Sequence, residues 1–76
     1  MTARDCFEKG LDAGVKYGCD GRYRLAATAK EAGFESPIDY LSGEALEMGL
    51  SHPLDYVIGV LTVVGVVEGF ERFYDV

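Results

Sequence analysis

Few side chains in this sequence have the types and spacing that catalysis requires. His52 is the only histidine, so any pairing of a nucleophile with a histidine base would have to form around it. It precedes Pro53 at the expected start of a helix, where we expect it to cap that helix or to face solvent. Glu44 and Glu47 are three residues apart and could act as acid and base or bind a metal, but we expect a solvated acidic face there. The sequence therefore predicts no enzyme activity.

No motif for a metal or a cofactor is present. Cys6 and Cys19 have an irregular spacing, and we expect two packed thiols rather than a disulfide or a metal pair. No cluster of cysteine and histidine has the spacing of a zinc site. The glycines form neither a phosphate-binding loop followed by lysine nor a dinucleotide fingerprint. We expect no metal and no cofactor.

The N-terminal residues and the longest apolar run bear on the compartment. Residues 1–5 lack the basic stretch and apolar segment of a signal peptide. The longest apolar run, Tyr56 to Val67, is shorter than the ~20 residues that a membrane-spanning helix needs. We expect a cytoplasmic protein with no membrane partner.

Charge is distributed unevenly along the chain, whose net charge is −6. Residues 1–30 carry six basic side chains and four acidic ones, whereas residues 31–76 carry Arg72 alone against nine acidic side chains. Six of these acids precede the apolar run: Glu31, Glu35, Asp39, Glu44, Glu47 and Asp55. A surface built from them would repel phosphate and attract cationic surfaces. The alternative is an ordinary solvated face that provides solubility.

The elements that must position these residues are expected to be helices. A chain of 76 residues has material for one core, and 49% hydrophobic residues favour a folded domain, so we expect a single domain over 1–76. The fold class predicted is all-α, a compact bundle of about four helices with a central hydrophobic C-terminal helix. The expected ranges are 3–17, 21–32, 37–48 and 53 to about 73.

Local signals mark the helix starts. Thr2 with Asp5 has the pattern of a capping box, Asp20 is a plausible cap for the second helix, and Ser36-Pro37 places a cap before proline at the first helical position. The stretch 36–43 resembles 52–59, with proline, aspartate, tyrosine and glycine in step, which supports two helices entered through proline.

The last expected helix carries conflicting signals. Residues 57–67 contain six valines and an isoleucine, which favour a strand, but they show neither alternation nor a hairpin turn. We assign helix, because a lone strand would have no partner. The first helix should pack closely on a neighbour, since three glycines four residues apart lie beside its apolar stripe of Phe7, Leu11 and Val15: Gly10, Gly14 and Gly18.

Residues 25–42 resemble the helix-turn-helix of DNA-binding proteins, with Ala29 in the first helix, Gly33 at the turn and Ser36 opening the second. The resemblance implies that residues 37–49 form the recognition helix. That helix contains no Lys or Arg but three acids, Asp39, Glu44 and Glu47. We therefore expect no direct contact with nucleic acid and keep DNA binding as a third hypothesis.

The first hypothesis is a non-catalytic module that binds a protein partner with a basic surface. In size and charge the chain is similar to phage-encoded inhibitors of host defence, including anti-CRISPR proteins, which implies a nucleic-acid mimic that blocks a basic groove. The expected contacts are Glu31, Glu35, Asp39, Tyr40, Glu44, Glu47, Asp55 and Tyr56, with the two tyrosines as aromatic anchors. Both tyrosines could instead belong to the core.

The alternative hypothesis is a structural homodimer or subunit. Small residues recur along one face of the last expected helix: Gly59, Thr62, Gly65 and Gly69. They permit close approach of a second copy but equally suit packing within one chain.

Overall fold

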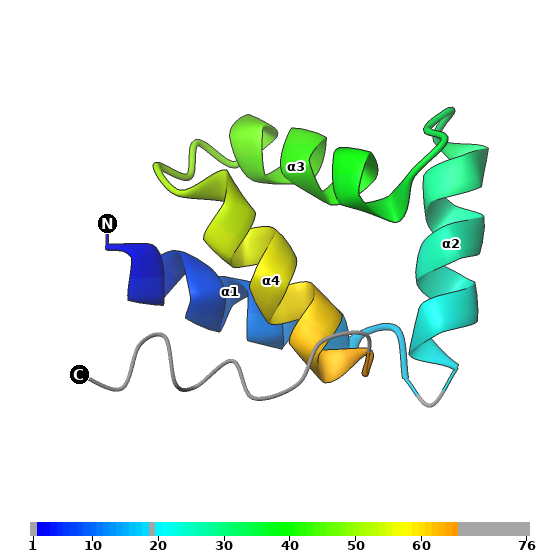
Figure 1. The fold of residues 1–76 in the computed structure, drawn as a ribbon, viewed down its shortest axis with the longest axis horizontal. Coiled ribbons are helices and arrows are strands. Elements are labelled where there is room, and N and C mark those ends of the chain that lie inside the picture. The colour runs from blue at the N-terminus through cyan, green and yellow to red at the C-terminus, as the bar shows by residue number, and fades with distance from the viewer. Residues whose placement is uncertain (1, 19, 66–76) are drawn as a thin grey trace.

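The described part of the chain is helical. A computed structural model describes residues 2–18 and 20–65, and these form four α-helices and no β-strand (Figure 1). The helices are α1 (Ala3–Val15), α2 (Gly21–Glu31), α3 (Pro37–Glu47) and α4 (Pro53–Val63). The all-α prediction is confirmed, and each helix begins at the residue that the sequence indicated. None of the helices in these ranges is long and apolar enough to cross a membrane.

Two of the helix starts have the side-chain caps that the sequence predicted. The Asp5 amide donates to Thr2 Oγ1 at 3.2 Å, and the Thr2 amide donates to Asp5 Oδ2 at 2.9 Å, which completes the capping box of α1. The bond from the Thr2 backbone lowers the pKa of the Asp5 carboxyl. At α3, the Ile38 amide donates to Ser36 Oγ at 3.2 Å. The predicted cap at Asp20 is wrong, because its side chain makes no capping hydrogen bond.

The end of α4 differs from the prediction. We expected this helix to run to about Phe73, but it ends at Val63, and Gly65 adopts a φ of +84°. The Gly65 amide donates to the Thr62 carbonyl at 3.3 Å, closing the last turn. The positive φ is a conformation that glycine enters without steric cost, so this glycine ends the helix instead of extending it. Residues 66–73 of the predicted helix lie outside the described residues.

The closest contact in the fold joins α1 to α4. A Cβ atom built on Gly59 would lie 2.9 Å from Gly10 Cα and would overlap the Phe7 carbonyl oxygen. Reciprocally, a Cβ on Gly10 would lie 2.9 Å from Gly59 Cα and would overlap the Tyr56 carbonyl oxygen. The two backbones therefore touch with only hydrogens between them. Glycine at both positions is what permits this approach, as the sequence predicted for Gly10.

The hydrophobic core is centred on α4, which lies across α1 on one side and against α3 on the other (Figure 1). The core side chains are Cys6, Tyr17, Leu25, Leu41, Ala45, Leu50, Tyr56, Val57, Val60 and Leu61. Cys6 is a buried free thiol, as expected, and Cys19 lies outside the described residues. The prediction of a central hydrophobic fourth helix is confirmed.

The predicted apolar stripe of α1 is wrong at its C-terminal end. Phe7 is buried, but Val15 is 68% exposed, because the buried side of the helix runs through Gly10 and Gly14. Gly14 packs on α4, where an added Cβ would lie 2.8 Å from Val63 Cβ. Gly18 has open space around it and a φ of +69°, so it follows the end of the helix and does not serve helix packing.

We expect Gly59→Ala to destabilise the protein by about 2–3 kcal/mol, because the new methyl group would meet backbone atoms that have no room to move. The measurement is urea unfolding followed by far-UV circular dichroism.

Gly43 is the matched control, since it holds the equivalent position in the repeat on α3. A Cβ there would lie 3.7 Å from the Phe34 ring, in ordinary contact. Gly43→Ala should raise stability by about 0.5–1 kcal/mol through helix propensity. Equal stabilities of the two variants would contradict the proposed role of the α1–α4 contact.

Candidate binding surface

The eight residues predicted to contact a partner do not share one environment. Four carboxylates are exposed to solvent: Glu31, Glu35, Asp39 and Glu47. Three residues are half-buried: Tyr40, Glu44 and Asp55. Tyr56 is 1% exposed and is one of the largest fully buried side chains. The predicted set therefore divides into a surface part and an internal part.

Glu44 and Tyr56 belong to an internal polar cluster. The Tyr56 hydroxyl donates to Glu44 Oε1, and the Tyr40 hydroxyl donates to Glu44 Oε2 at 3.3 Å. The two tyrosines hold equivalent positions in the repeat, and their hydroxyls meet on one carboxylate. Tyr56 is a predicted partner anchor, but its ring lies in the core and offers almost no surface to a partner. Glu44 is a predicted contact, and both its oxygens accept hydrogen bonds from within the chain.

Tyr17 completes this cluster and was not identified from the sequence. Its side chain is 4% exposed, and its hydroxyl has no hydrogen-bond partner among the described residues. Burial, with the nearby charge of Glu44 and the Tyr40 hydroxyl, raises the pKa of Tyr17 to about 12. Burial and the same carboxylate raise the pKa values of Tyr40 and Tyr56. All three hydroxyls are therefore protonated at neutral pH, and those of Tyr40 and Tyr56 act as donors to Glu44.

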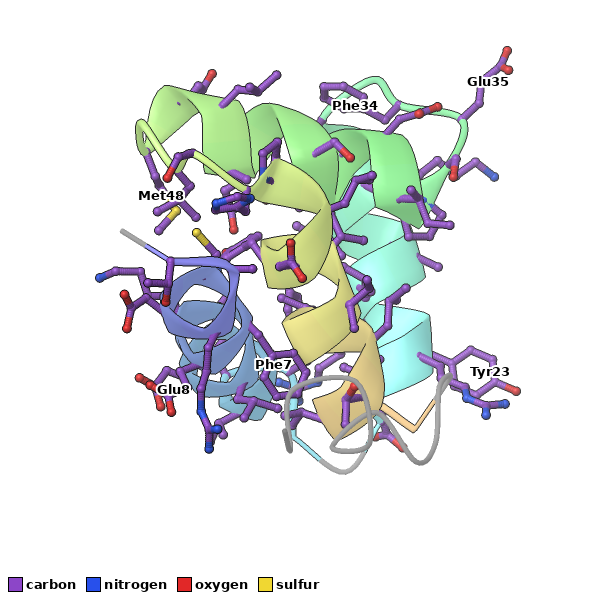
Figure 2. The ribbon with its side chains drawn as sticks, turned by 60° about the vertical axis from the view of Figure 1, so that its left-hand side comes forward. Phe7, Glu8, Tyr23, Phe34, Glu35 and Met48 are labelled. Carbon is purple, nitrogen blue, oxygen red and sulfur yellow. The ribbon has the colours of Figure 1, made fainter. Side chains whose placement is uncertain are left out.

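An exposed aromatic ring lies at the connection between α2 and α3. Phe34 is 39% exposed, and its ring meets Tyr40 edge to face, with centroids 5.7 Å apart. The ring lies over Gly43 on α3, where an added Cβ would be in ordinary contact with it at 3.7 Å. The Phe34 amide donates to the Ala29 carbonyl at 2.9 Å, which folds the residue back onto the end of α2. Figure 2 shows Phe34 and Glu35 at this edge, with Glu35 directed away from the body of the protein.

Exposed carboxylates lie near this ring in the sequence, on both sides of Phe34 and along α3. Glu31 ends α2 and Glu35 follows Phe34, while Asp39 and Glu47 lie one helical turn on either side of Gly43 on α3. We call this surface the acid–aromatic corner: Glu31, Phe34, Glu35, Asp39, Tyr40 and Glu47. Asp55 lies outside it, on the first turn of α4.

The carboxylates of the corner have no cationic partners within the described chain. Across residues 2–18 and 20–65 the ion pair found joins Arg4 to Glu8 on α1, at 3.6 Å. Two cations, Lys16 and Arg24, line a hollow of about 470 Å³ beside the corner, together with Tyr17, Glu31 and Tyr40. Among the described residues the corner thus presents negative charge without an ion-pair partner. Its side toward α1 also carries the cations Lys16 and Arg24.

Comparison with protein-family models, with curated proteins and with solved structures found no match.

In the described ranges, no group of three or more His, Cys, Asp or Glu side chains is placed to hold a metal ion. His52 is exposed and makes no capping bond through its side chain.

The other two hypotheses rest on the helical corner at Gly33 and on the small residues of α4. The helical corner that resembles a helix-turn-helix is formed by α2 and α3, with Gly33 at a φ of +91° between them (Figure 1). The exposed charged residues of α3 are Asp39 and Glu47. Gly59, the first member of the proposed dimer face, is buried against α1 of the same chain. Gly65 ends the helix, and Gly69 lies outside the described residues.

The internal cluster predicts opposite effects for two conservative variants. Tyr56→Phe removes a donor to a carboxylate and should cost about 1–2 kcal/mol of stability. Tyr17→Phe removes a buried hydroxyl without a partner and should leave stability unchanged or raise it by up to about 1 kcal/mol. Urea unfolding of both variants beside the wild type makes the comparison. A loss for Tyr17→Phe as large as that for Tyr56→Phe would contradict this description of the cluster.

Proposed function

We propose that this protein is a non-catalytic binding module that docks its acid–aromatic corner on a basic surface of a partner protein. The partner is one whose basic surface otherwise binds nucleic acid, so that docking blocks it. This is the mode of action of a nucleic-acid mimic, and it would make the protein an inhibitor of the kind that phages direct at host defence, anti-CRISPR proteins included.

The observation that carries the proposal is the exposed Phe34 ring, with neighbouring exposed carboxylates that have no ion-pair partner among the described residues. Aromatic side chains that are held in place are strong anchors in protein interfaces, because they bury a large area at a small cost in entropy. The ring of Phe34 packs edge to face on Tyr40 and lies over Gly43. A charged rim adds attraction and orientation during encounter rather than affinity alone.

The spacing of the carboxylates suits a basic groove. Asp39 and Glu47 are two helical turns apart on α3, and Glu31 and Glu35 extend the charge across the connection from α2. A row of this kind presents negative charge over several ångströms, as a phosphate backbone does, and is attracted by the same Lys and Arg side chains. The proposal therefore keeps four predicted carboxylates and Tyr40, and adds Phe34 as the anchor.

The other two hypotheses have no supporting observation. A dimer through α4 would need Gly59, which contacts α1 of the same chain. DNA binding through α3 would need a basic surface where Asp39 and Glu47 are exposed. We do not propose either function.

The proposal is tested by capture of a partner from lysate of the native host at low and high salt. We expect a stoichiometric complex with a nucleic-acid-binding protein that high salt dissociates, and that competes with nucleic acid for the same surface. Replacing Glu35, Asp39 and Glu47 together by lysine should weaken the complex at least about 10-fold, as should Phe34→Ala alone.

The matched control replaces three exposed acids elsewhere, Glu8, Asp12 and Asp20, by lysine and changes the net charge equally. It should weaken the complex much less, because those residues lie on α1 and before α2. Equal weakening by both triple variants would show that only net charge matters and would contradict a role for the corner. Circular dichroism of every variant establishes that it is folded.

A further inference from the structure

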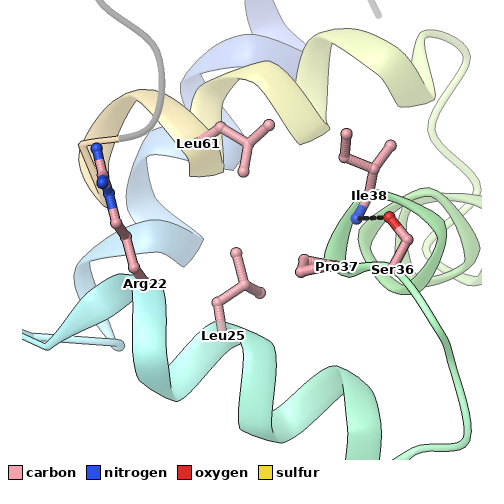
Figure 3. A pocket seen from close by; sticks show the side chains of 6 residues that line it. All are labelled: Arg22, Leu25, Ser36, Pro37, Ile38 and Leu61. Carbon is pink, nitrogen blue, oxygen red and sulfur yellow. Dashed lines mark hydrogen bonds between the residues drawn. The ribbon is translucent and has the colours of Figure 1, made fainter.

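A second hollow, apart from the acid–aromatic corner, lies between α2, the start of α3 and α4 (Figure 3). We call it the Arg22 groove; its volume is about 470 Å³, and its lining residues are Arg22, Leu25, Ser36, Pro37, Ile38 and Leu61. Figure 3 shows Leu25, Leu61 and Pro37 directed toward one shared space from three helices, with Arg22 at one end. Hollows of this size hold small organic ligands.

The groove exists because α2 stands at one end of the fold. Near its start, α2 touches the end of α4, where a Cβ added to Gly21 would lie 2.9 Å from Val64 Cβ. Toward its other end it meets the start of α3, which runs across it (Figure 1). Between these two contacts, Leu25 and Leu61 line the floor and the side chains of Pro37 and Ile38 line one wall. Ile38 is 49% exposed, so this wall is open to a ligand.

Arg22 supplies a charge at the end of this apolar space. Its Nη2 donates to the Gly65 carbonyl, which fixes the guanidinium beside the groove. No carboxylate pairs with it in the described part of the chain; Asp20 shares with it only the neighbouring hollow at Gly65. Among the described residues the guanidinium therefore has further N–H donors and no carboxylate partner. The Ser36 hydroxyl accepts from the Ile38 amide and keeps its O–H as a donor, so Arg22 is the charged group in the lining of the groove.

We propose that the Arg22 groove binds a small apolar monocarboxylate, such as a medium-chain fatty acid. The hydrocarbon part packs on Leu25, Pro37, Ile38 and Leu61, and the carboxylate accepts charge-assisted hydrogen bonds from Arg22. The positive charge at the end of the groove selects an anion over a cation of the same length. The proposal is independent of the acid–aromatic corner, because none of the residues that line the groove belongs to that corner.

The test compares three probes of equal chain length: octanoate, octan-1-ol and octylamine. Each is titrated into the ¹⁵N-labelled full-length protein, and amide shifts in two-dimensional NMR spectra give the site and the affinity. We expect shifts at Leu25, Ile38 and Leu61, with octanoate binding about 2- to 5-fold tighter than octanol and octylamine binding weakest. Shifts elsewhere, no shifts, or equal binding of octanoate and octanol would overturn the proposal.

Variants separate the two parts of the site. Arg22→Gln retains an N–H donor for the Gly65 carbonyl but removes the charge, so it should abolish the preference for octanoate while octanol still binds. Ile38→Glu should remove octanoate binding altogether. The matched control is Leu54→Glu, which changes another exposed apolar residue that does not line the groove and should leave binding unchanged. A preference for octanoate that survives Arg22→Gln would contradict the role of the guanidinium.

Discussion

The contact between Gly10 and Gly59 is the constraint on which the rest of this structure depends. At that point two helix backbones approach until each Cα hydrogen faces a carbonyl of the other helix, toward Tyr56 on one side and Phe7 on the other. Contacts of the Cα–H···O type recur at such close helix crossings and contribute favourably to each. The close approach also removes water from Val57, Val60 and Cys6, which are among the most buried residues. α3 packs against α4 of this tightly packed pair, and α2 packs against α3.

The polar cluster around Glu44 fixes α3 against the α1–α4 pair. Tyr56 reaches Glu44 from α4, Tyr40 reaches it from the previous turn of α3, and Tyr17 lies beside it after α1. A half-buried carboxylate that accepts two hydroxyl hydrogen bonds is strongly tied to one orientation of its helix. With Glu44 turned inward, Asp39 and Glu47 remain on the exposed side of α3. The internal cluster thus determines which acids form the acid–aromatic corner.

Local features of the fold were predictable from the sequence, because their causes are local. The caps at Thr2 and Ser36 and the proline starts at Pro37 and Pro53 depend on a few neighbouring residues. The close approach at Gly10 was also predictable, since spaced glycines on a helix weaken it unless packing compensates. The end of α4 was not, because Gly65 lies among valines and no polar residue or proline marks a stop. Only the backbone conformation of Gly65, with a φ of +84°, shows that the helix ends there.

The candidate surface was predictable in part. The acidic character of residues 31–47 is a matter of composition, and four of these carboxylates are exposed. The burial of Tyr56 and Glu44 depends on which helices pack together. The position of each residue along its own helix does not indicate this. The repeat suggested equal roles for Tyr40 and Tyr56, yet one ring is half-buried and the other is in the core, because Gly59 brings α4 against α1 while Gly43 faces the Phe34 ring. The turn at Gly33 was expected from the sequence, but the exposure of Phe34 was not, because it depends on how the ring packs on Tyr40 and Gly43.

Native-state hydrogen exchange tests the central claim, that the α1–α4 contact is the most stable unit of the fold. Amides of Val57 to Leu61 in α4 and of Gly10 to Gly14 in α1 should exchange only through global unfolding, whereas those of Leu25 to Ala29 in α2 should exchange through a smaller opening that leaves α1 and α4 paired. Equal protection of α2 and α4, or an opening that separates α1 from α4 first, would contradict the account.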